Sequence, residues 1–215
     1  RPSRKPAAGA TTPMLAATGS TITAIQIADA ANTTTITDMT ATQAANITLL
    51  AGAGAMTLGI KNATDVGTVN TMKITVTDGD TTASEALAGT ADWTIAGVET
   101  VEITAFDDLT IAGMTNISGL TTLKASGAGD VSVTTGALAL GANFGVDFSG
   151  LTKASTFAFA AATTNALSFI GGSGVDTVTT SVVGGNILTL GLGADAVTMQ
   201  AVTGGTAATQ ITGGG

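Results

Sequence analysis

The sequence predicts an all-β fold, a right-handed parallel β-helix or β-solenoid with little or no helix. Short apolar runs alternate with turns rich in small residues, which indicates many short β-strands. Few turns contain the Asn-Gly or Asp-Gly pairs typical of hairpins, and a glycine-rich nonapeptide recurs near the C-terminal end. Aromatic residues, which usually fill sandwich cores, make up only 3% of the 215 residues, so a narrow stacked core is favoured over a sandwich.

Three regions follow from the order of these patterns along the chain. Residues 1–19 contain all three prolines and predict an extended or disordered arm. Residues 20–170 predict the solenoid body, in which apolar residues alternate along short strands. Within this body, residues 82–91 predict a short helix or helical turn, and Trp93 is expected to pack over an irregular coil. Residues 171–215 predict coils with glycine and aspartate turns.

The charge and composition of the chain argue against several functional classes. The net charge is −8, and three of the seven basic residues are Arg1, Arg4 and Lys5, so nothing resembles a basic track for nucleic acid. No apolar run reaches the roughly 18 residues needed to span a bilayer, so membrane insertion is not expected. Cys and His are absent, which removes disulfides, thiolate metal sites and the commonest general base. We therefore expect a protein that is not an enzyme.

The best-preserved nonapeptide occupies residues 171–179, and an imperfect echo occupies residues 190–198. Glycines allow a tight turn with positive φ, so that carbonyls can point into the turn, and the aspartate adds an anionic oxygen. Ca²⁺ prefers several oxygen ligands of this kind. Asp176 and Asp195 are 19 residues apart, which predicts that they lie on successive coils and complete one site. The alternative is a flexible glycine loop with a solvated aspartate.

Two further turns are candidates for the same chemistry. Residues 127–130 form another Gly-x-Gly turn that ends in aspartate, and Asp78 and Asp80 flank a glycine. Solvated turns are favoured over calcium loops for that pair and for Asp107 with Asp108, and acid–base catalysis is disfavoured because aromatic sugar platforms are missing. The full set of candidate calcium ligands comprises Gly172, Gly174, Asp176, Gly191, Gly193, Asp195, Gly127, Gly129, Asp130, Asp78 and Asp80.

Two features of the sequence resemble a known protein family. Residues 171–179 and their echoes at residues 190–198 and 204–212 resemble RTX-type repeats. Residues 95–103, 109–111 and 119–123 are similar to the repetitive strand body of RTX-containing bacterial surface-layer (S-layer) proteins. The resemblance implies an extracellular Gram-negative protein, type I secretion, a β-solenoid and calcium-dependent folding or assembly. The chain differs from the long arrays of the family in having one well-preserved repeat.

Together these patterns predict a structural, self-assembling extracellular protein that forms a lattice or filament at the cell surface. Ca²⁺ is the expected cofactor and further copies of the same chain are the expected partner, with cell-surface polysaccharide as a second candidate partner. An adhesin or passenger-type binding module is the first alternative. A β-helical polysaccharide enzyme is the second alternative, and Lys73 near Asp78 and Asp80 is its only candidate cluster.

Overall fold

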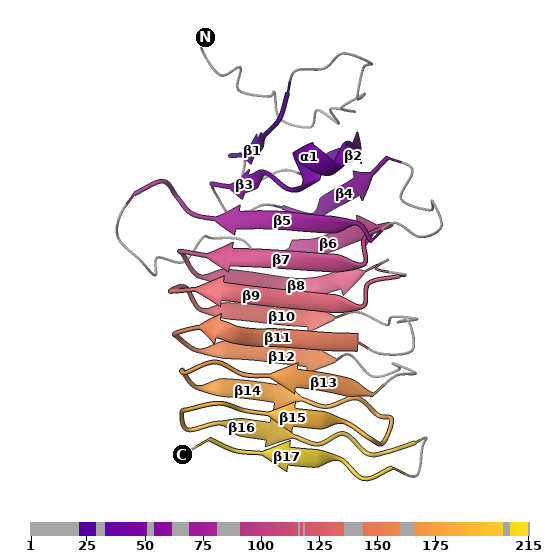
Figure 1. Ribbon diagram of the computed structural model, residues 1–215, viewed down its shortest axis with the longest axis vertical. Coiled ribbons are helices and arrows are strands. Elements are labelled where there is room, and N and C mark those ends of the chain that lie inside the picture. Colours follow the sequence, from indigo (N-terminus) through magenta and orange to yellow (C-terminus); the bar gives the residue numbers. More distant parts are fainter. Residues whose placement is uncertain are drawn as a thin grey trace.

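The described part of the chain forms two parallel β-sheets and one short helix in a computed structural model (Figure 1). The predicted arm at residues 1–19 lies outside the described residues, and so does the predicted helical turn as far as residue 90. The structure describes residues 22–28, 33–50, 54–61, 69–80, 91–115, 117, 119–135, 144–159, 166–203 and 207–214.

Each sheet is a single row of parallel strands. The nine strands of sheet A are β1 (Ile25–Ile27), β3 (Ile47–Leu49), β5 (Thr71–Val76), β7 (Thr100–Ala105), β9 (Thr122–Gly127), β11 (Phe144–Leu151), β13 (Leu167–Ile170), β15 (Ile187–Thr189) and β17 (Gln210–Thr212). The eight strands of sheet B are β2 (Thr34–Met39), β4 (Met56–Ile60), β6 (Ala91–Ala96), β8 (Leu109–Thr115), β10 (Val131–Thr135), β12 (Ser155–Phe159), β14 (Asp176–Thr179) and β16 (Ala196–Thr198).

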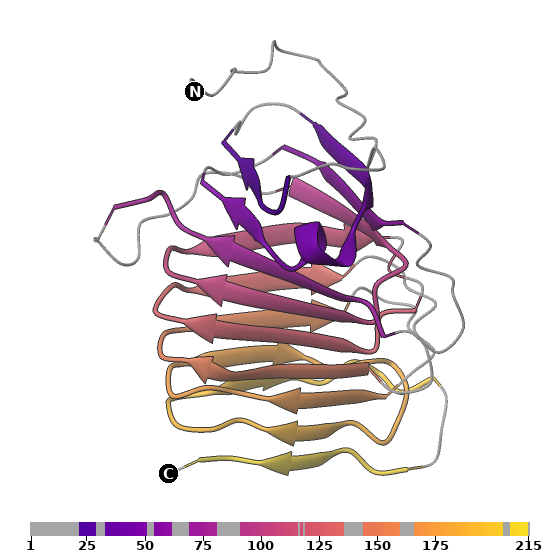
Figure 2. The same ribbon diagram turned by 45° about the horizontal axis from the view of Figure 1, so that its top comes forward.

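The order of the strands shows how the chain winds. Neighbours within a sheet are always two strands apart in the sequence, so the chain alternates between sheets and each coil gives one strand to each. The strands stack along the long axis of the molecule, as Figures 1 and 2 show. The paired strands are parallel because successive coils run in the same direction, and main-chain hydrogen bonds join each strand to the next coil. The predicted all-β parallel solenoid is confirmed.

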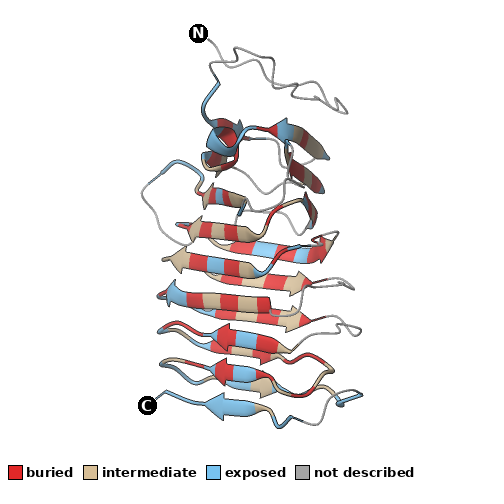
Figure 3. Cartoon of the chain, turned by 45° about the vertical axis from the view of Figure 1, so that its right-hand side comes forward, coloured by how far each residue is buried: buried red, intermediate tan, exposed pale blue. Residues whose placement is uncertain are grey.

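The alternation of residues along each strand explains why the coils close on a narrow core. In β7 the side chains of Val101, Ile103 and Ala105 are buried, whereas the alternating threonines and Glu102 are partly exposed. The same alternation recurs on the neighbouring strands (Figure 3). Because the strands pair in register, buried residues stack on buried residues, as Val101 does on Leu123. The result is a continuous apolar layer between the two sheets.

Phenylalanines contribute more to the core than the low aromatic content suggests. Of the six in the chain, five lie in the described core and form a cluster of ring contacts in the coils that contain β11 to β13. The rings of Phe157 and Phe159 are 5.0 Å apart and nearly perpendicular, a favourable edge-to-face arrangement. Trp93 is also buried, in β6 between Met56 and Met114 of the neighbouring strands, which confirms its predicted packing role.

One helix was not anticipated from the sequence. α1 (Ala41–Ala44) lies between β2 and β3, at the end of the stack that contains β1 (Figure 2). Thr40 caps it, because its hydroxyl accepts the Gln43 N–H while the Gln43 side chain accepts the Thr40 N–H. The buried Gln43 amide also donates to the Ile22 carbonyl at 3.1 Å, so the helix joins the preceding segment to the first coils.

Replacing Phe157 by alanine should destabilise the fold strongly, because the ring is fully buried and contacts four other phenylalanines. We expect a loss of about 3–5 kcal/mol in the free energy of unfolding, measured by urea denaturation with Trp93 fluorescence. Phe106→Ala is the matched control, since that ring is 51% exposed and its loss should change stability little. Equal effects of the two substitutions would contradict the described core.

Candidate functional site

The candidate calcium ligands all lie along one edge of the solenoid. We call this edge the Gly/Asp corner: it comprises the turns that follow β5, β7, β9, β11, β13 and β15 and lead toward sheet B. Main-chain hydrogen bonds continue from turn to turn, for example from Leu192 N–H to the Gly172 carbonyl at 3.1 Å. The corner is therefore stacked as regularly as the sheets that it joins.

The close stacking of successive turns explains why glycine occurs at several positions of the corner. Gly191 has φ +77°, and a Cβ there would lie 2.0 Å from the Gly172 carbonyl oxygen. Gly193 has φ +129°, and its Cβ would lie 2.3 Å from the Gly174 carbonyl oxygen. Both the left-handed backbone and the closeness of the next coil exclude side chains. The glycine pattern of the nonapeptide is thus required by the approach of one coil to the next.

Asp176 connects three successive coils. Its side chain is fully buried, with one carboxylate oxygen accepting the Gly172 N–H at 2.9 Å and the other accepting the Ser155 hydroxyl. Its own main-chain N–H donates to the Asp195 carboxylate at 3.0 Å. The structure therefore brings Asp176 and Asp195 together on successive coils, as their spacing predicts.

The surroundings of Asp176 oppose its ionisation. Burial raises the pKa of the Asp176 carboxyl above its ordinary value. The hydrogen bonds from Ser155 and Gly172 lower that pKa, since they stabilise the carboxylate, and the nearby Asp195 carboxylate raises it. Burial is the largest of these effects, so the folded coil holds this proton more tightly than the unfolded chain does.

The other aspartates of the corner also join coils through main-chain N–H groups. Asp107 accepts the Asp78 N–H at 2.7 Å, and Asp108 accepts the Asp130 N–H at 2.8 Å. Asp130 in turn accepts the Ala154 N–H at 3.1 Å. Asp78 and Asp80 are exposed, but Asp107 is buried, so the expectation of a solvated turn is wrong for Asp107. Asp107 is buried because its carboxylate accepts a hydrogen bond from Asp78 on the preceding coil.

The chemistry of the corner suits calcium, although its carboxylates already have partners. Carboxylates and main-chain carbonyls are the oxygens that Ca²⁺ prefers, and the turns around Asp176 and Asp195 bring both kinds together. Each of these two carboxylates also accepts a main-chain N–H. Within the described residues no group of three or more acidic side chains is close enough to hold a metal ion. Glycine carbonyls would therefore have to supply most ligands.

The opposite edge of the solenoid contains a polar residue that the sequence did not single out. Asn186 is fully buried, and its side-chain oxygen accepts the Leu167 N–H at 2.9 Å. Its amide group donates to the Val183 carbonyl at 2.8 Å and to the Thr209 hydroxyl at 3.2 Å. Asn186 thus connects neighbouring coils, as Asp176 does at the corner. No motif or periodicity marks it, because its role depends on which residues stack beside it.

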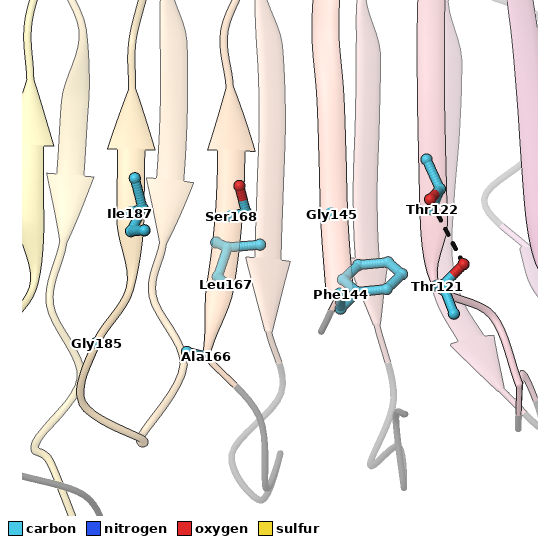
Figure 4. Close-up of a pocket in the computed structure, with 9 residues that line it drawn as sticks. All are labelled: Thr121, Thr122, Phe144, Gly145, Ala166, Leu167, Ser168, Gly185 and Ile187. Carbon is cyan, nitrogen blue, oxygen red and sulfur yellow. Dashed lines mark hydrogen bonds between the residues drawn. The ribbon is translucent and has the colours of Figure 1, made fainter. Parts of the chain in front are cut away.

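A shallow hollow of about 340 Å³ lies on the outer face of sheet A (Figure 4). It is at the beginning of β9, β11, β13 and β15, on the edge away from the Gly/Asp corner. None of the described residues that line it has an ionisable side chain, so these residues offer no acid or base. Its lining residues are Thr121, Thr122, Phe144, Gly145, Ala166, Leu167, Ser168, Gly185 and Ile187.

Comparison with known proteins provides no further assignment, since no family model, no curated protein and no solved structure matches the chain. Among the described residues, no helix has the length and apolar character needed to cross a membrane.

The stability of the last coils should depend on pH through Asp176. A folded-state pKa above the unfolded value contributes stability at acidic pH, and this contribution is lost as the pH rises through the folded-state pKa. We expect the melting temperature, measured in chelator, to fall between acidic and neutral pH. Asp176→Asn should reduce that slope, whereas Asp38→Asn, at an exposed position in β2, should leave it unchanged. An equal slope in all three proteins would contradict this assignment.

Proposed function

We propose that this chain is a structural, self-assembling extracellular protein whose stacked coils form the unit of a surface lattice or filament. The observation that carries the proposal is the stacking of every described coil on the next through parallel strand pairing, which a further coil can continue. Ile211 in β17 is 46% exposed, whereas Leu188, its partner in β15, is 1% exposed. A further coil of the same kind, supplied by a second copy, would bury Ile211 and continue the ladder of main-chain hydrogen bonds.

The residues around Ile211 favour contact with a second copy of the chain. No charged residue occurs in residues 196–214, although the whole chain has a net charge of −8. Natural sheet edges are usually protected by charged side chains, prolines or bulges, and the described strand β17 contains none of these. Met199 and Val202, which follow β16, are also exposed, at 54% and 50%. Burial of these apolar side chains would stabilise a contact between copies.

The two ends of the described stack differ. At the other end, Ile25 and Ile27 of β1 and Met39 of β2 are all buried. α1 contributes to this cover through the contact of Gln43 with the Ile22 carbonyl. Because the two ends differ, the proposed contact is head-to-tail, with the β17 end of one copy against the β1 end of the next. A heterologous contact of this kind builds an open filament.

Replacing Ile211 by lysine should prevent this contact, because a charge would enter the apolar interface. We expect long assemblies in electron micrographs of the parent chain and none for Ile211→Lys, with light scattering falling toward the 20.7 kDa monomer. Phe106→Lys is the matched control, since Phe106 is similarly exposed at 51% but lies in the turn after β7, away from both ends of the stack. A parent chain that stays monomeric at every concentration would refute the proposed function.

We propose Ca²⁺ as the cofactor of the paired turns around Asp176 and Asp195. The support is chemical: two carboxylates and a set of glycine carbonyls lie on successive coils at this corner. Bound calcium would neutralise the two acids and hold the coils together. The remaining candidates, around Asp130 and around Asp78, have the same ligand chemistry but fewer glycines.

Calcium should therefore raise the melting temperature of the parent chain relative to chelator, since a ligand that binds only the folded state stabilises it. Asp195→Asn should remove most of this rise by weakening one ligand. Asp38→Asn should retain the full rise, because Asp38 lies in β2, outside the corner. Equal melting temperatures of the parent in millimolar calcium and in chelator would rule out this cofactor without affecting the proposed assembly.

A further inference from the structure

The charges of sheet A are confined to one row of side chains. The strands of this sheet contain only four ionisable residues: Lys73, Glu102, Lys124 and Asp147. They lie on the adjacent strands β5, β7, β9 and β11, and each is paired in register with the next. The row therefore alternates in sign along the stack: positive, negative, positive, negative.

This row lies on the outer face of the sheet. Residues on either side along the strands, such as Met72 and Ile74 beside Lys73, are buried, so the charged side chains project away from the core. With strands about 4.8 Å apart, the row is about 14 Å long. The neighbouring outward positions hold short hydroxyl side chains, including Thr100, Thr122 and Ser126, so the longer charged groups stand above the face.

Within one copy, only part of the row is paired. Lys73 and Glu102 form an ion pair at 2.8 Å, with their side chains 55% and 36% exposed. Lys124 lies between two acids in register, yet within the described residues it has no acidic oxygen inside 4 Å. Asp147 accepts hydrogen bonds from the hydroxyl and main-chain N–H of Ser149. An exposed cation and a nearby acid thus remain available to another molecule.

A row of four alternating charges is complementary to itself when it is reversed. We propose that the outer face of sheet A binds the same face of a second copy, with the two rods antiparallel. In this arrangement Lys73 faces Asp147 of the partner subunit, and Glu102 faces Lys124 of the partner subunit. A two-fold axis between β7 and β9 then repeats each pair, which gives a closed, isologous contact.

The charge pattern also selects this arrangement over its competitors. Parallel rods in register would place like charges opposite each other along the whole row. Antiparallel rods shifted by two strands would bring only two of the four charges of each copy opposite a partner charge, in place of all four. The inference rests on the proposed role as an assembling rod. It adds a lateral contact between rods, which the end contact does not provide.

The test uses the Ile211→Lys chain, in which the end contact is blocked, and measures dimerisation by sedimentation velocity. We expect a concentration-dependent dimer in that chain. Adding Glu102→Lys places a lysine opposite Lys124 of the partner subunit at both symmetry-related positions. It should raise the dimer dissociation constant at least about tenfold. Asp92→Lys is the matched control, because it makes the same change of charge on the outer face of sheet B and should leave the dimer intact.

A charge swap separates the contact between copies from the ladder within one copy. Glu102→Lys combined with Lys124→Glu restores opposite charges across the two-fold axis, but it places like charges on neighbouring strands of the same chain. We therefore expect the dimer to return while the melting temperature does not rise above that of the unswapped chain. Failure of the swap to restore the dimer, or the absence of any dimer in the Ile211→Lys chain, would overturn the inference. Long assemblies of the parent would still support the proposed function in that case.

Discussion

The structure depends on the in-register stacking of successive coils through parallel main-chain hydrogen bonds. The spacing between strands, about 4.8 Å, brings every residue close to its equivalents on the coils above and below. Most inward positions are therefore apolar from coil to coil, as at Val101, Leu123 and Val146. An outward position forms a row whose members interact directly, as Lys73 and Glu102 do. The core, the corner and the outer faces all follow from this repetition.

At the Gly/Asp corner the same spacing imposes two further conditions. The carbonyls of one turn approach the backbone of the next so closely that glycine is required at Gly191 and Gly193. The N–H groups of the turns also need acceptors, which Asp107, Asp108, Asp130 and Asp195 provide from neighbouring coils. Burial of an acid here has an electrostatic cost, which explains the raised pKa of Asp176. Glycine and aspartate thus have a structural role at the corner that does not depend on a metal ion.

Repetition also makes each surface of the rod uniform, which is favourable for association. No charged residue occurs in residues 196–214, whereas the β1 end is covered, so the two ends of the described stack differ. The outer face of sheet A concentrates its charges in one alternating row. In the strands of sheet B the only charged residues at exposed positions are Asp38 and Asp92. An end contact based on apolar burial and a lateral contact based on charge would use different forces. Together, an open end contact and a closed lateral contact would join the rods into paired filaments.

The sequence by itself determined the fold class, because alternating apolar residues and recurring glycine turns are local signals that do not depend on coil length. It also placed Asp176 and Asp195 on successive coils, since those coils are short and nearly regular. Only the tertiary structure decided which other residues meet, because stacked partners are separated by 19, 21, 22 or 29 residues along the chain. With the period changing from coil to coil, the burial of Asp107, the contacts of Asn186 and the charge row of sheet A could not be read from spacing.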